Sequence, residues 1–407
     1  MITFAEYLAE GAEGKNLHLE HLEDEVLNNG VNGTRAAINF LQSLRDMLAG
    51  STKSSVNVTV KWDGAPAVFA GINPENKRFF VGTKGVFNKN PKVNYTNADI
   101  DANHSSPGLN SKLKAALKYL PKLGIKDVLQ GDMLFTQDDL STETIDGKSY
   151  LTFQPNTIVY AVPKESSNKI KKAKMGIVWH TTYSGEKLED MRATFGANIS
   201  GLRKTDDVYF TDADYRDTSG TVNFNKAETA SITKVLSSAG KKFRELKSTF
   251  MNELMNDNNL LILVKTFNNV KVREGQKISN TTKHTGEMIK YINAKLQKDI
   301  DKIKTEKNRE IKTKNKNELI SYITKNRVNF KNIFDMQNLL VDAKNMVIRK
   351  LEKAKGAMDT FIRTDNGYRV TAPEGFVAID RMGDAVKLVD RLEFSRANFN
   401  AAKNWTK

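Results

Sequence analysis

The first string in the chain with chemical potential is Val60-Lys61-Trp62-Asp63-Gly64, in which a lysine on an expected strand precedes an acid and a glycine. A lysine amine is a weak nucleophile at neutral pH because its unperturbed pKa is about 10.4. Nearby cations and burial both favour the neutral amine, which can attack an electrophile. Gly64 leaves room for a ligand to approach the backbone, and Asp63 could hold a hydrated metal ion. Taken alone, the string equally describes a surface lysine beside a β-turn.

A second charged pair stands in the string PEGFVAIDRMGDAVKLVDR. Glu374 opens one expected strand, and Lys387 lies on the next strand, after the MGD turn. An acid at a strand start and a lysine one hairpin later can point into a cleft shared with Lys61. Glu374 would then bind metal and Lys387 would bind phosphate. The alternative is an ordinary exposed hairpin with alternating charges.

Six ordered places along the chain resemble the motifs of the covalent lysine nucleotidyltransferase superfamily, which comprises ATP-dependent DNA ligases, RNA ligases and mRNA capping enzymes. KWDG resembles the nucleophile motif, FVGTKG the strand motif that follows it, and GDMLF the third motif. MGIVWHTTY is similar to the next strand, where Trp179 would stack on the base, and EGFVAI and AVKLV resemble the last two motifs. The chain departs from the family at Lys84, where arginine is usual, and at Asp132, where glutamate is common.

The resemblance implies an ATP-dependent polynucleotide ligase that works through a covalent lysyl-AMP intermediate. Lys61 would attack the α-phosphate of ATP, AMP would pass to a 5′-phosphate end, and a 3′-hydroxyl would displace AMP to seal the strand. The implied cofactors are ATP and Mg²⁺, for which Mn²⁺ could substitute. The implied catalytic residues are Lys61, Asp63, Glu374 and Lys387, of which Asp63 and Glu374 would hold the metal. The implied nucleotide-binding residues are Lys61, Gly64, Lys84, Asp132, Trp179 and Lys387.

The elements that must position these residues predict an α+β fold whose core is an antiparallel-sheet nucleotidyltransferase, similar to ATP-grasp-like ligases. Apolar residues at helical spacing predict an N-terminal helical segment over residues 1–50, in which NNGVNGT would end one helix and Thr34 would cap the next. Alternating β-branched residues predict the first part of the core over residues 51–224. Within it we expect two antiparallel strands at 56–73 and 77–87, a helix at 109–124, and strands at DVLQGDMLF, TIVYAVP and MGIVWHTTY.

From about Asn225 the sequence changes to long helical patterns rich in Lys, Asn and Glu, which predict a basic helical insertion over residues 225–363. Residues 364–407 are expected to return to the core as its final strands. The stretch DKIKTEKNREIKTKNKNE lacks large apolar residues, so it is either a solvated helix or a mobile linker. Residues 390–407, which follow AVKLV, are too few for the OB-fold that DNA ligases and capping enzymes usually carry. We therefore expect an RNA-ligase-like branch, in which the Lys-rich helices neutralise phosphates without reading bases.

Composition limits the classes of partner and site. The net charge of +15 favours a polyanionic partner, with RNA expected before DNA, and the absence of cysteine excludes disulfides, thiolate metal sites and cysteine nucleophiles. We find neither a secretory leader nor an apolar run of about 18 residues, so we expect a soluble cytoplasmic protein with no membrane partner. The Lys and Asn bias is compatible with a bacteriophage source, and hence with the host cytoplasm. His18 and His21 do not match the HExxH spacing, so we expect them on a polar helix face.

Two alternatives to the RNA-ligase interpretation remain open at this point. The first is an atypical ATP-dependent DNA ligase. The second is a catalytically silent nucleic-acid-binding or virion-associated protein with the same fold, which the residues at positions 84 and 132 and the large insertion would favour.

Overall fold

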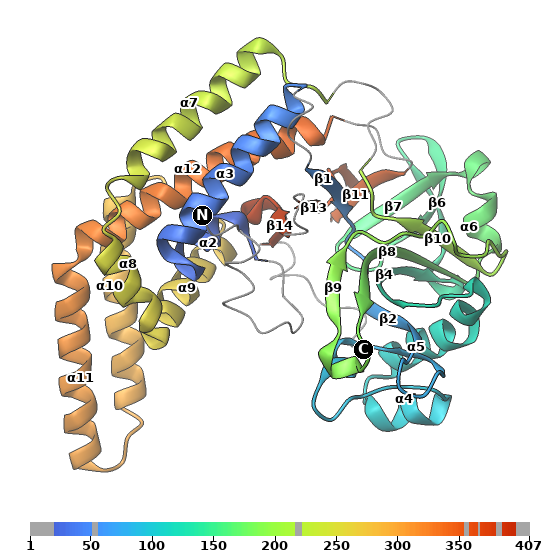
Figure 1. The fold of residues 1–407 in the computed structure, drawn as a ribbon, viewed down its shortest axis with the longest axis horizontal. Coiled ribbons are helices and arrows are strands. Elements are labelled where there is room, and N and C mark those ends of the chain that lie inside the picture. The colour runs from blue at the N-terminus through green and yellow to red at the C-terminus, as the bar shows by residue number, and fades with distance from the viewer. Residues whose placement is uncertain are drawn as a thin grey trace.

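The computed structural model describes residues 20–50, 56–215, 222–353, 358–364, 367–379 and 385–395 of the 407-residue chain. These residues form an α+β protein in which long helices gather on one side and most strands on the other (Figure 1). We call residues 22–48 and 226–351 the helical lobe, and residues 67–212 with 359–370 the β-lobe. Between the two lobes lies a small sheet that joins strands from both ends of the chain.

The helical lobe is formed by the N-terminal helices and by a continuous helical region later in the chain. The N-terminal part comprises the 3₁₀ helix η1 (Leu22–Asp24), α2 (Glu25–Asn28) and α3 (Gly30–Leu48). The later part comprises α7 (Lys226–Phe243), α8 (Ser248–Asn256), α9 (Asn258–Arg273), α10 (Thr281–Ile300), α11 (Glu306–Lys325) and α12 (Arg327–Leu351). The helical region thus ends at Leu351, and the chain returns to strand at Asp359.

The start of α3 differs from the expected helix stop and cap. Gly30 begins α3, and Thr34 lies inside it, where its hydroxyl donates to the Gly30 carbonyl at 2.7 Å. A Cβ at Gly33 would lie 2.3 Å from the carbonyl oxygen of Glu25. The glycine at this position therefore permits close packing of α3 against α2, which a pattern of helix breakers does not reveal.

The described strands form three sheets. Sheet A has the order β1 (Asn57–Lys61), β13 (Gly375–Ile379), β14 (Ala385–Leu388). Sheet B has the order β10 (Val208–Asp212), β8 (Met175–Ser184), β4 (Val128–Thr136), β2 (Ala67–Ile72), β3 (Phe79–Gly82), with β9 (Arg192–Phe195) also paired to β8. Sheet C has the order β12 (Gly367–Val370), β11 (Asp359–Thr364), β7 (Ile158–Pro163), β6 (Lys148–Phe153), β5 (Ser141–Ile145). All their pairings are antiparallel except that of β10 with β8.

The stretch 56–73, predicted as one strand, is two strands in different sheets. β1 ends at Lys61 in sheet A, and β2 begins at Ala67 in sheet B, so the chain crosses between sheets within KWDGAP. Gly64 and Pro66 lie at the crossing, and a proline there cannot donate to a strand ladder. The predicted antiparallel pairing after this point is confirmed, because β2 pairs with β3.

Apolar layers attach each sheet to its neighbours. One face of sheet A, including Phe376 and Leu388, shares a core with α3, α7, α9 and α12. One face of sheet B packs on α4 (Asn97–Asn103) and α5 (Pro107–Tyr119), where Leu113 and Ala116 meet Met133 and Trp179. Side chains of sheets B and C meet in a further core that includes Phe135, Phe153 and Tyr160. Sheet A is therefore built on the helical lobe as much as on the strands beside it.

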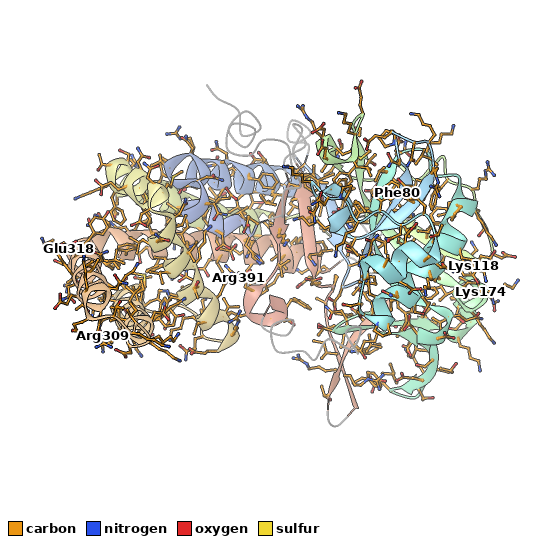
Figure 2. All side chains as sticks on the ribbon, turned by 90° about the horizontal axis from the view of Figure 1, so that it is seen from below. Phe80, Lys118, Lys174, Arg309, Glu318 and Arg391 are labelled. Carbon is orange, nitrogen blue, oxygen red and sulfur yellow. The ribbon has the colours of Figure 1, made fainter. Side chains whose placement is uncertain are left out.

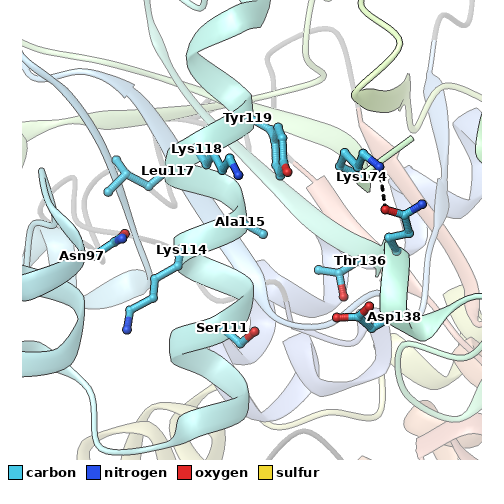
Figure 3. A pocket seen from close by; sticks show the side chains of 11 residues that line it. Asn97, Ser111, Lys114, Ala115, Leu117, Lys118, Tyr119, Thr136, Asp138 and Lys174 are labelled. Carbon is cyan, nitrogen blue, oxygen red and sulfur yellow. Dashed lines mark hydrogen bonds between the residues drawn. The ribbon is translucent and has the colours of Figure 1, made fainter. Parts of the chain in front are cut away.

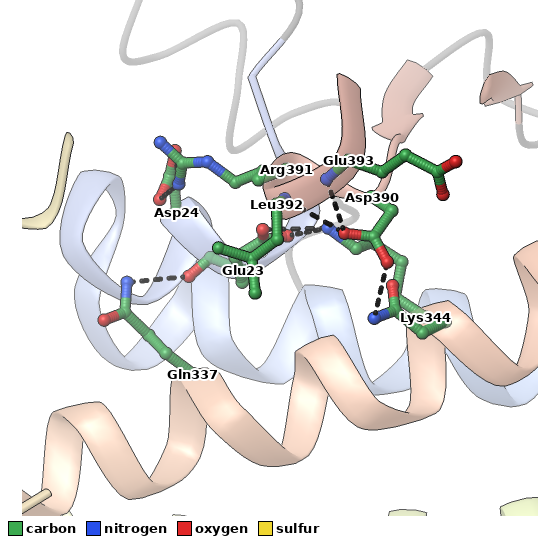
Figure 4. A network of polar contacts seen from close by, with 9 residues as sticks. Glu23, Asp24, Gln337, Lys344, Asp390, Arg391, Leu392 and Glu393 are labelled. Atoms are coloured by element: carbon green, nitrogen blue, oxygen red, sulfur yellow. Dashed lines mark hydrogen bonds and ion pairs between the residues drawn. The ribbon is translucent and has the colours of Figure 1, made fainter. Parts of the chain in front are cut away.

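A buried polar network ties both ends of the described chain to α12 (Figure 4). Lys344 of α12 contacts both carboxylate oxygens of Glu23, at 2.8 and 2.7 Å, and these side chains are 1% and 5% exposed. Arg391 donates to the carboxylate of Asp24 at 2.9 and 3.1 Å and to the amide oxygen of Asn269 at 2.7 Å. The segment after β14 is thereby held against the helical lobe.

The helical lobe includes a charged helix that is largely exposed to solvent. α11 holds most of the stretch DKIKTEKNREIKTKNKNE and buries only Ile323, so this stretch is a solvated helix. Arg309 and Glu318 mark its position at one end of the molecule, and Lys118 and Lys174 lie at the other end (Figure 2). No described helix is long and apolar enough to cross a membrane.

Candidate active site

Lys61 and Glu374 form an ion pair where sheet A begins. Lys61 is the last residue of β1 and pairs in register with Gly375, so the side chain of the preceding Glu374 lies beside the Lys61 ammonium and accepts a hydrogen bond from it. The Lys61 side chain is 26% exposed and that of Glu374 is 9% exposed. A Cβ at Gly375, where φ is +152°, would lie 2.5 Å from the Leu388 carbonyl oxygen. This glycine lets the backbone turn into β13 directly after Glu374.

Lys387 joins this pair from the third strand of sheet A. It lies opposite Val377, which in turn lies opposite Thr59 on β1. Because side chains alternate along a strand, Lys387, Thr59 and Lys61 share one face of the sheet, and the apolar face that meets the helical lobe is the other one. The Lys387 backbone N–H donates to the Glu20 carbonyl at 3.2 Å, and Lys387 also forms a parallel bridge with His21.

Electrostatics of the cluster keep Lys61 protonated in this state. Burial lowers the pKa of Lys61, but the Glu374 carboxylate, with Asp132 and Asp63 beyond it, outweighs burial and raises the pKa above its usual value. Burial raises the pKa of Glu374, and the Lys61 ammonium opposes that change. Burial, and then the charge of Lys61, lower the pKa of Lys387. Removal of the Glu374 charge would therefore leave burial and Lys387 to favour a neutral Lys61 amine.

Asp63 is a structural anchor for a neighbouring loop. Its carboxylate accepts hydrogen bonds from the Asn156 side-chain amide at 2.8 Å and from the backbone N–H groups of Thr157 and Ile158 at 2.6 and 2.7 Å. Its own N–H donates to the Tyr160 hydroxyl at 2.8 Å. Asp63 is 3% exposed. Its oxygens hold the entry to β7, which corrects the expectation that Asp63 holds a metal.

Gly64 brings the chain from Lys61 into contact with Asp132 on β4. A Cβ at Gly64 would lie 2.6 Å from the Asp132 Cβ, and the Ala65 N–H donates to the Met133 carbonyl at 2.9 Å. The Asp132 carboxylate lies 3.6 Å from His180 Nε2, and its side chain is 22% exposed. Asp132 therefore faces the Lys61 cluster from sheet B.

Trp179 does not face this cluster, so its predicted role in base stacking is wrong. The indole is fully buried in the core between sheet B and α5. The pairing of β4 with β8 shifts register between Gln130 and Gly131, whose partners are Thr181 and Trp179. His180 is the extra residue of this β-bulge, so the strict alternation on which the prediction relied fails here.

His180 is the residue at the site that the sequence interpretation missed. It lies beside Asp132, and its Nδ1 lies 2.8 Å from the Thr181 hydroxyl. The sequence carried one signal for this arrangement, since Gly131 stands opposite Trp179 and a Cβ there would lie 2.7 Å from the indole ring. A glycine under a tryptophan indicates that the ring packs over the neighbouring strand.

Lys84 follows β3, which pairs with β2, and β2 pairs with β4 at Asp132. It begins the 3₁₀ helix η2 (Lys84–Phe87) after β3, is exposed, and makes no hydrogen bond or ion pair with another described residue. His18 lies outside the described residues. His21 is close to the cluster through its bridge to Lys387, and burial and the charge of Arg391 lower its pKa. Among residues with described positions, no group of three His, Asp or Glu side chains is arranged to hold a metal ion.

A cavity of about 840 Å³ lies behind sheet A and is distinct from the Lys61 cluster. Val60 and Phe376 line it, and these side chains project from the face of sheet A opposite Lys61. Its wall is aromatic, with Trp62 stacked on Tyr160 at 5.1 Å between ring centroids. Its lining also carries one lysine and five carboxylates, namely Lys148, Asp146, Asp212, Asp214, Glu352 and Asp359. The excess of carboxylates makes this cavity unfavourable for phosphate.

Comparison with known proteins identifies a family and no characterised relative. No curated protein matches the chain, and no solved structure matches it. The sequence model of one family, described as a family of unknown function (DUF6267), matches residues 16–403. That span covers the helical lobe, all three sheets and the Lys61 cluster, so the chain belongs to the DUF6267 family.

Proposed function

We propose that this protein is an ATP-dependent, RNA-ligase-like nucleotidyltransferase that forms lysyl-AMP at Lys61 and joins 5′-phosphate to 3′-hydroxyl ends. One observation carries the proposal. Lys61, Asp132, Glu374 and Lys387 come from widely separated motifs, and each of the other three acts electrostatically on Lys61 or is acted on by it. Buried lysines and carboxylates whose pKa values perturb one another are typical of active sites, which favours a functional role for this cluster.

The first step would be attack of Lys61 Nζ on the α-phosphorus of ATP. The Nζ–P bond forms, the bond from phosphorus to the bridging oxygen breaks, and pyrophosphate leaves with that electron pair. Lys61 must lose a proton before it attacks, and release from Glu374 lowers its pKa because burial then dominates. Lys387, on the same face of sheet A, would bind the phosphate charge that develops in the transition state.

The later steps reuse the same groups. AMP would pass from Lys61 to a 5′-phosphate, and a 3′-hydroxyl would then displace AMP to form the phosphodiester. Glu374 and Asp132 are the carboxylates that fit a hydrated Mg²⁺ or Mn²⁺, because both act on Lys61 and Asp63 is engaged by three donors. The cation would neutralise phosphate charge and replace Lys61 as the partner of Glu374.

The test is incubation of the protein with α-labelled ATP or GTP and Mg²⁺ or Mn²⁺, followed by acid treatment and peptide mapping. We expect an acid-stable label on Lys61 from ATP, and no label in Lys61→Ala or in Lys61→Arg, whose guanidinium stays protonated. Lys314→Ala is the matched control, because this exposed lysine lies on the solvated helix α11, and it should label normally. Full labelling of Lys61→Ala would end the proposal.

A second candidate is a catalytically silent nucleic-acid-binding protein that retains the fold. The raised pKa of Lys61 and the engagement of Asp63 by its own loop favour it. Absence of label in the unaltered protein with either nucleotide and either cation, together with tight binding of nucleic acid, would support this candidate.

A further inference from the structure

A hollow of about 510 Å³ lies on the outer surface of α5, away from every residue discussed above (Figure 3). Lys114, Lys118 and Tyr119 project from α5, and Thr136, Asp138 and Lys174 face them from the neighbouring segment. The lining thus holds three lysines and one carboxylate, with neutral donors such as Asn97 and Ser111 around them. Its charge is opposite to that of the acidic cavity behind sheet A.

The hollow and the candidate active site lie on opposite faces of sheet B. The inner side of α5 packs through Leu113 and Ala116 onto the face of sheet B that carries Trp179. Asp132 and His180 project from the other face, towards Lys61. A ligand in the hollow therefore cannot touch Lys61, and a role there must be separate from nucleotide chemistry.

Two of the three lysines keep their charge available to a ligand. Lys118 is exposed, and its Nζ lies 5.2 Å from the centre of the Tyr119 ring. Lys174 Nζ donates to the neutral side chain of Gln137 at 2.8 Å. Neither lysine pairs with a carboxylate among the described residues, whereas Lys114 pairs with Asp101 at 2.7 Å.

The positive charge continues beyond the hollow on the side of α6. On the side of the 3₁₀ helix η3 (Leu120–Leu123), Lys122 lies 5.4 Å from the Tyr119 ring but pairs with Asp207 at 2.5 Å, so its charge is already balanced. On the other side, α6 (Asn168–Lys172) leads into Lys174 and exposes Lys169, Lys171 and Lys172. These three lysines extend the positive charge from Lys174 along α6.

We propose that this basic hollow binds the sugar-phosphate backbone of a nucleic acid. Lys118 and Lys174 neutralise phosphates, hydroxyl and amide groups of the lining donate to phosphate oxygens, and Tyr119 packs beside the chain. Such contacts hold the polymer without reading its bases. The inference deepens the proposed function by giving the polymer substrate a second contact behind sheet B. It does not require that Lys61 accept a nucleotide, because binding is measurable without ATP.

The test is the affinity of the Lys118→Glu/Lys174→Glu variant for a fluorescently labelled single-stranded RNA of about 20 nucleotides. The affinity is measured by fluorescence anisotropy in the absence of ATP. Charge reversal at two phosphate contacts should weaken binding at least tenfold at low salt. It should also reduce the slope of log affinity against log salt by about 1.4, since each lost contact on a single strand contributes about 0.7. Lys118→Arg/Lys174→Arg should bind normally, because both charges remain.

Lys148→Glu/Lys164→Glu is the matched control, with the same change of charge in the same lobe. These two lysines line a different hollow on sheet C, in the company of Glu165 and Asp359. We expect this variant to keep its affinity and its salt slope. An unchanged affinity in Lys118→Glu/Lys174→Glu would overturn the assignment, and so would an equal loss in both charge-reversal variants. Labelling of Lys61 by α-labelled ATP, measured in parallel, should be the same in all of these variants, which separates this test from that of the covalent step.

Discussion

At the scale of single residues, the protonation of Lys61 is controlled by the carboxylate that it touches. The charge of Glu374 holds the pKa of Lys61 above its usual value against the effect of burial. Such a lysine is an ammonium at neutral pH, so any reaction that uses its lone pair must wait for deprotonation. The same ion pair stabilises the folded chain at neutral pH and loses that effect as the pH rises through the raised pKa of Lys61.

The first prediction follows from this control. In the unaltered protein, labelling of Lys61 without excess divalent cation should increase with pH through the alkaline range. Glu374→Gln removes the negative charge that raises the Lys61 pKa, so the rise should occur at lower pH, although the maximal rate should fall because a metal-binding carboxylate is lost. The measurement is the pH profile of label incorporation for both proteins. An identical midpoint in the two profiles would show that Glu374 does not set the protonation of Lys61.

At the scale of elements, a β-bulge decides which aromatic and imidazole groups face the site. The shift of register between β4 and β8 places Trp179 in the core and leaves His180 beside Asp132. Two neighbouring residues therefore have different roles, and a substitution at each should affect a different property.

The second prediction separates these roles. Trp179→Ala should lower the free energy of unfolding by about 3–5 kcal/mol, because it empties a fully buried indole site. His180→Ala should leave stability within about 0.5 kcal/mol and reduce the rate of Lys61 labelling, since His180 borders the cluster and is partly exposed. Urea unfolding and label incorporation measure the two properties. If His180→Ala labelled at the full rate, His180 would have no role in the labelling of Lys61.

Local patterns in the sequence predicted most elements and failed where two elements meet. The strands at GDMLF, TIVYAVP, MGIVWHTTY and the C-terminal hairpin were predictable because alternation and turn residues are local properties. The break of 56–73 into strands of two sheets and the bulge at His180 were not, because both depend on partners far along the chain. For the same reason Asp63 was predicted as a metal ligand, since its three donors come from residues 156–158.

The ion pair between Glu23 and Lys344 joins η1 to α12 and gives a third prediction. Glu23→Ala leaves the Lys344 ammonium buried without its partner, which should destabilise the protein by about 3–5 kcal/mol. The double variant Glu23→Met/Lys344→Met replaces both charges with apolar groups and should recover most of that loss. Thermal or urea unfolding of the three proteins measures the difference. A double variant as unstable as Glu23→Ala would indicate that the network contributes specific structure beyond the pair.

At the scale of the whole molecule, the helical region is part of the core that supports the site. Phe376 and Leu388, on the strands that carry Glu374 and Lys387, pack into the same apolar core as α7, α9 and α12. The polar network of Figure 4 adds hydrogen bonds from α12 to η1. Arg391 also donates to Asn269 of α9. The helical region is therefore integral to the fold, although a sequence reading suggests a separable insertion.

The fourth prediction tests this integration. Replacement of residues 226–351 by a short Gly/Ser linker should expose the apolar face of sheet A, and the product should lack a cooperative unfolding transition and should not label at Lys61. A milder change, Lys312→Glu/Lys314→Glu on the solvated helix α11, should leave both folding and labelling intact. Circular dichroism with thermal unfolding and label incorporation provide the comparison. A linker variant that folded and labelled normally would show that sheet A does not need the helical lobe.

The two members of the central ion pair lie at the places where the chain passes between sheets. Lys61 ends β1 just before the chain enters sheet B, and Glu374 precedes β13 just after the chain leaves sheet C. Sheet A shares its apolar core with the helical lobe, so a rotation of one lobe against the other would act on these two connections, together with those from β10 to α7 and from α12 to β11. Under the proposed function, such a rotation would change the distance between the Lys61 amine and the Glu374 carboxylate, and with it the pKa of the amine.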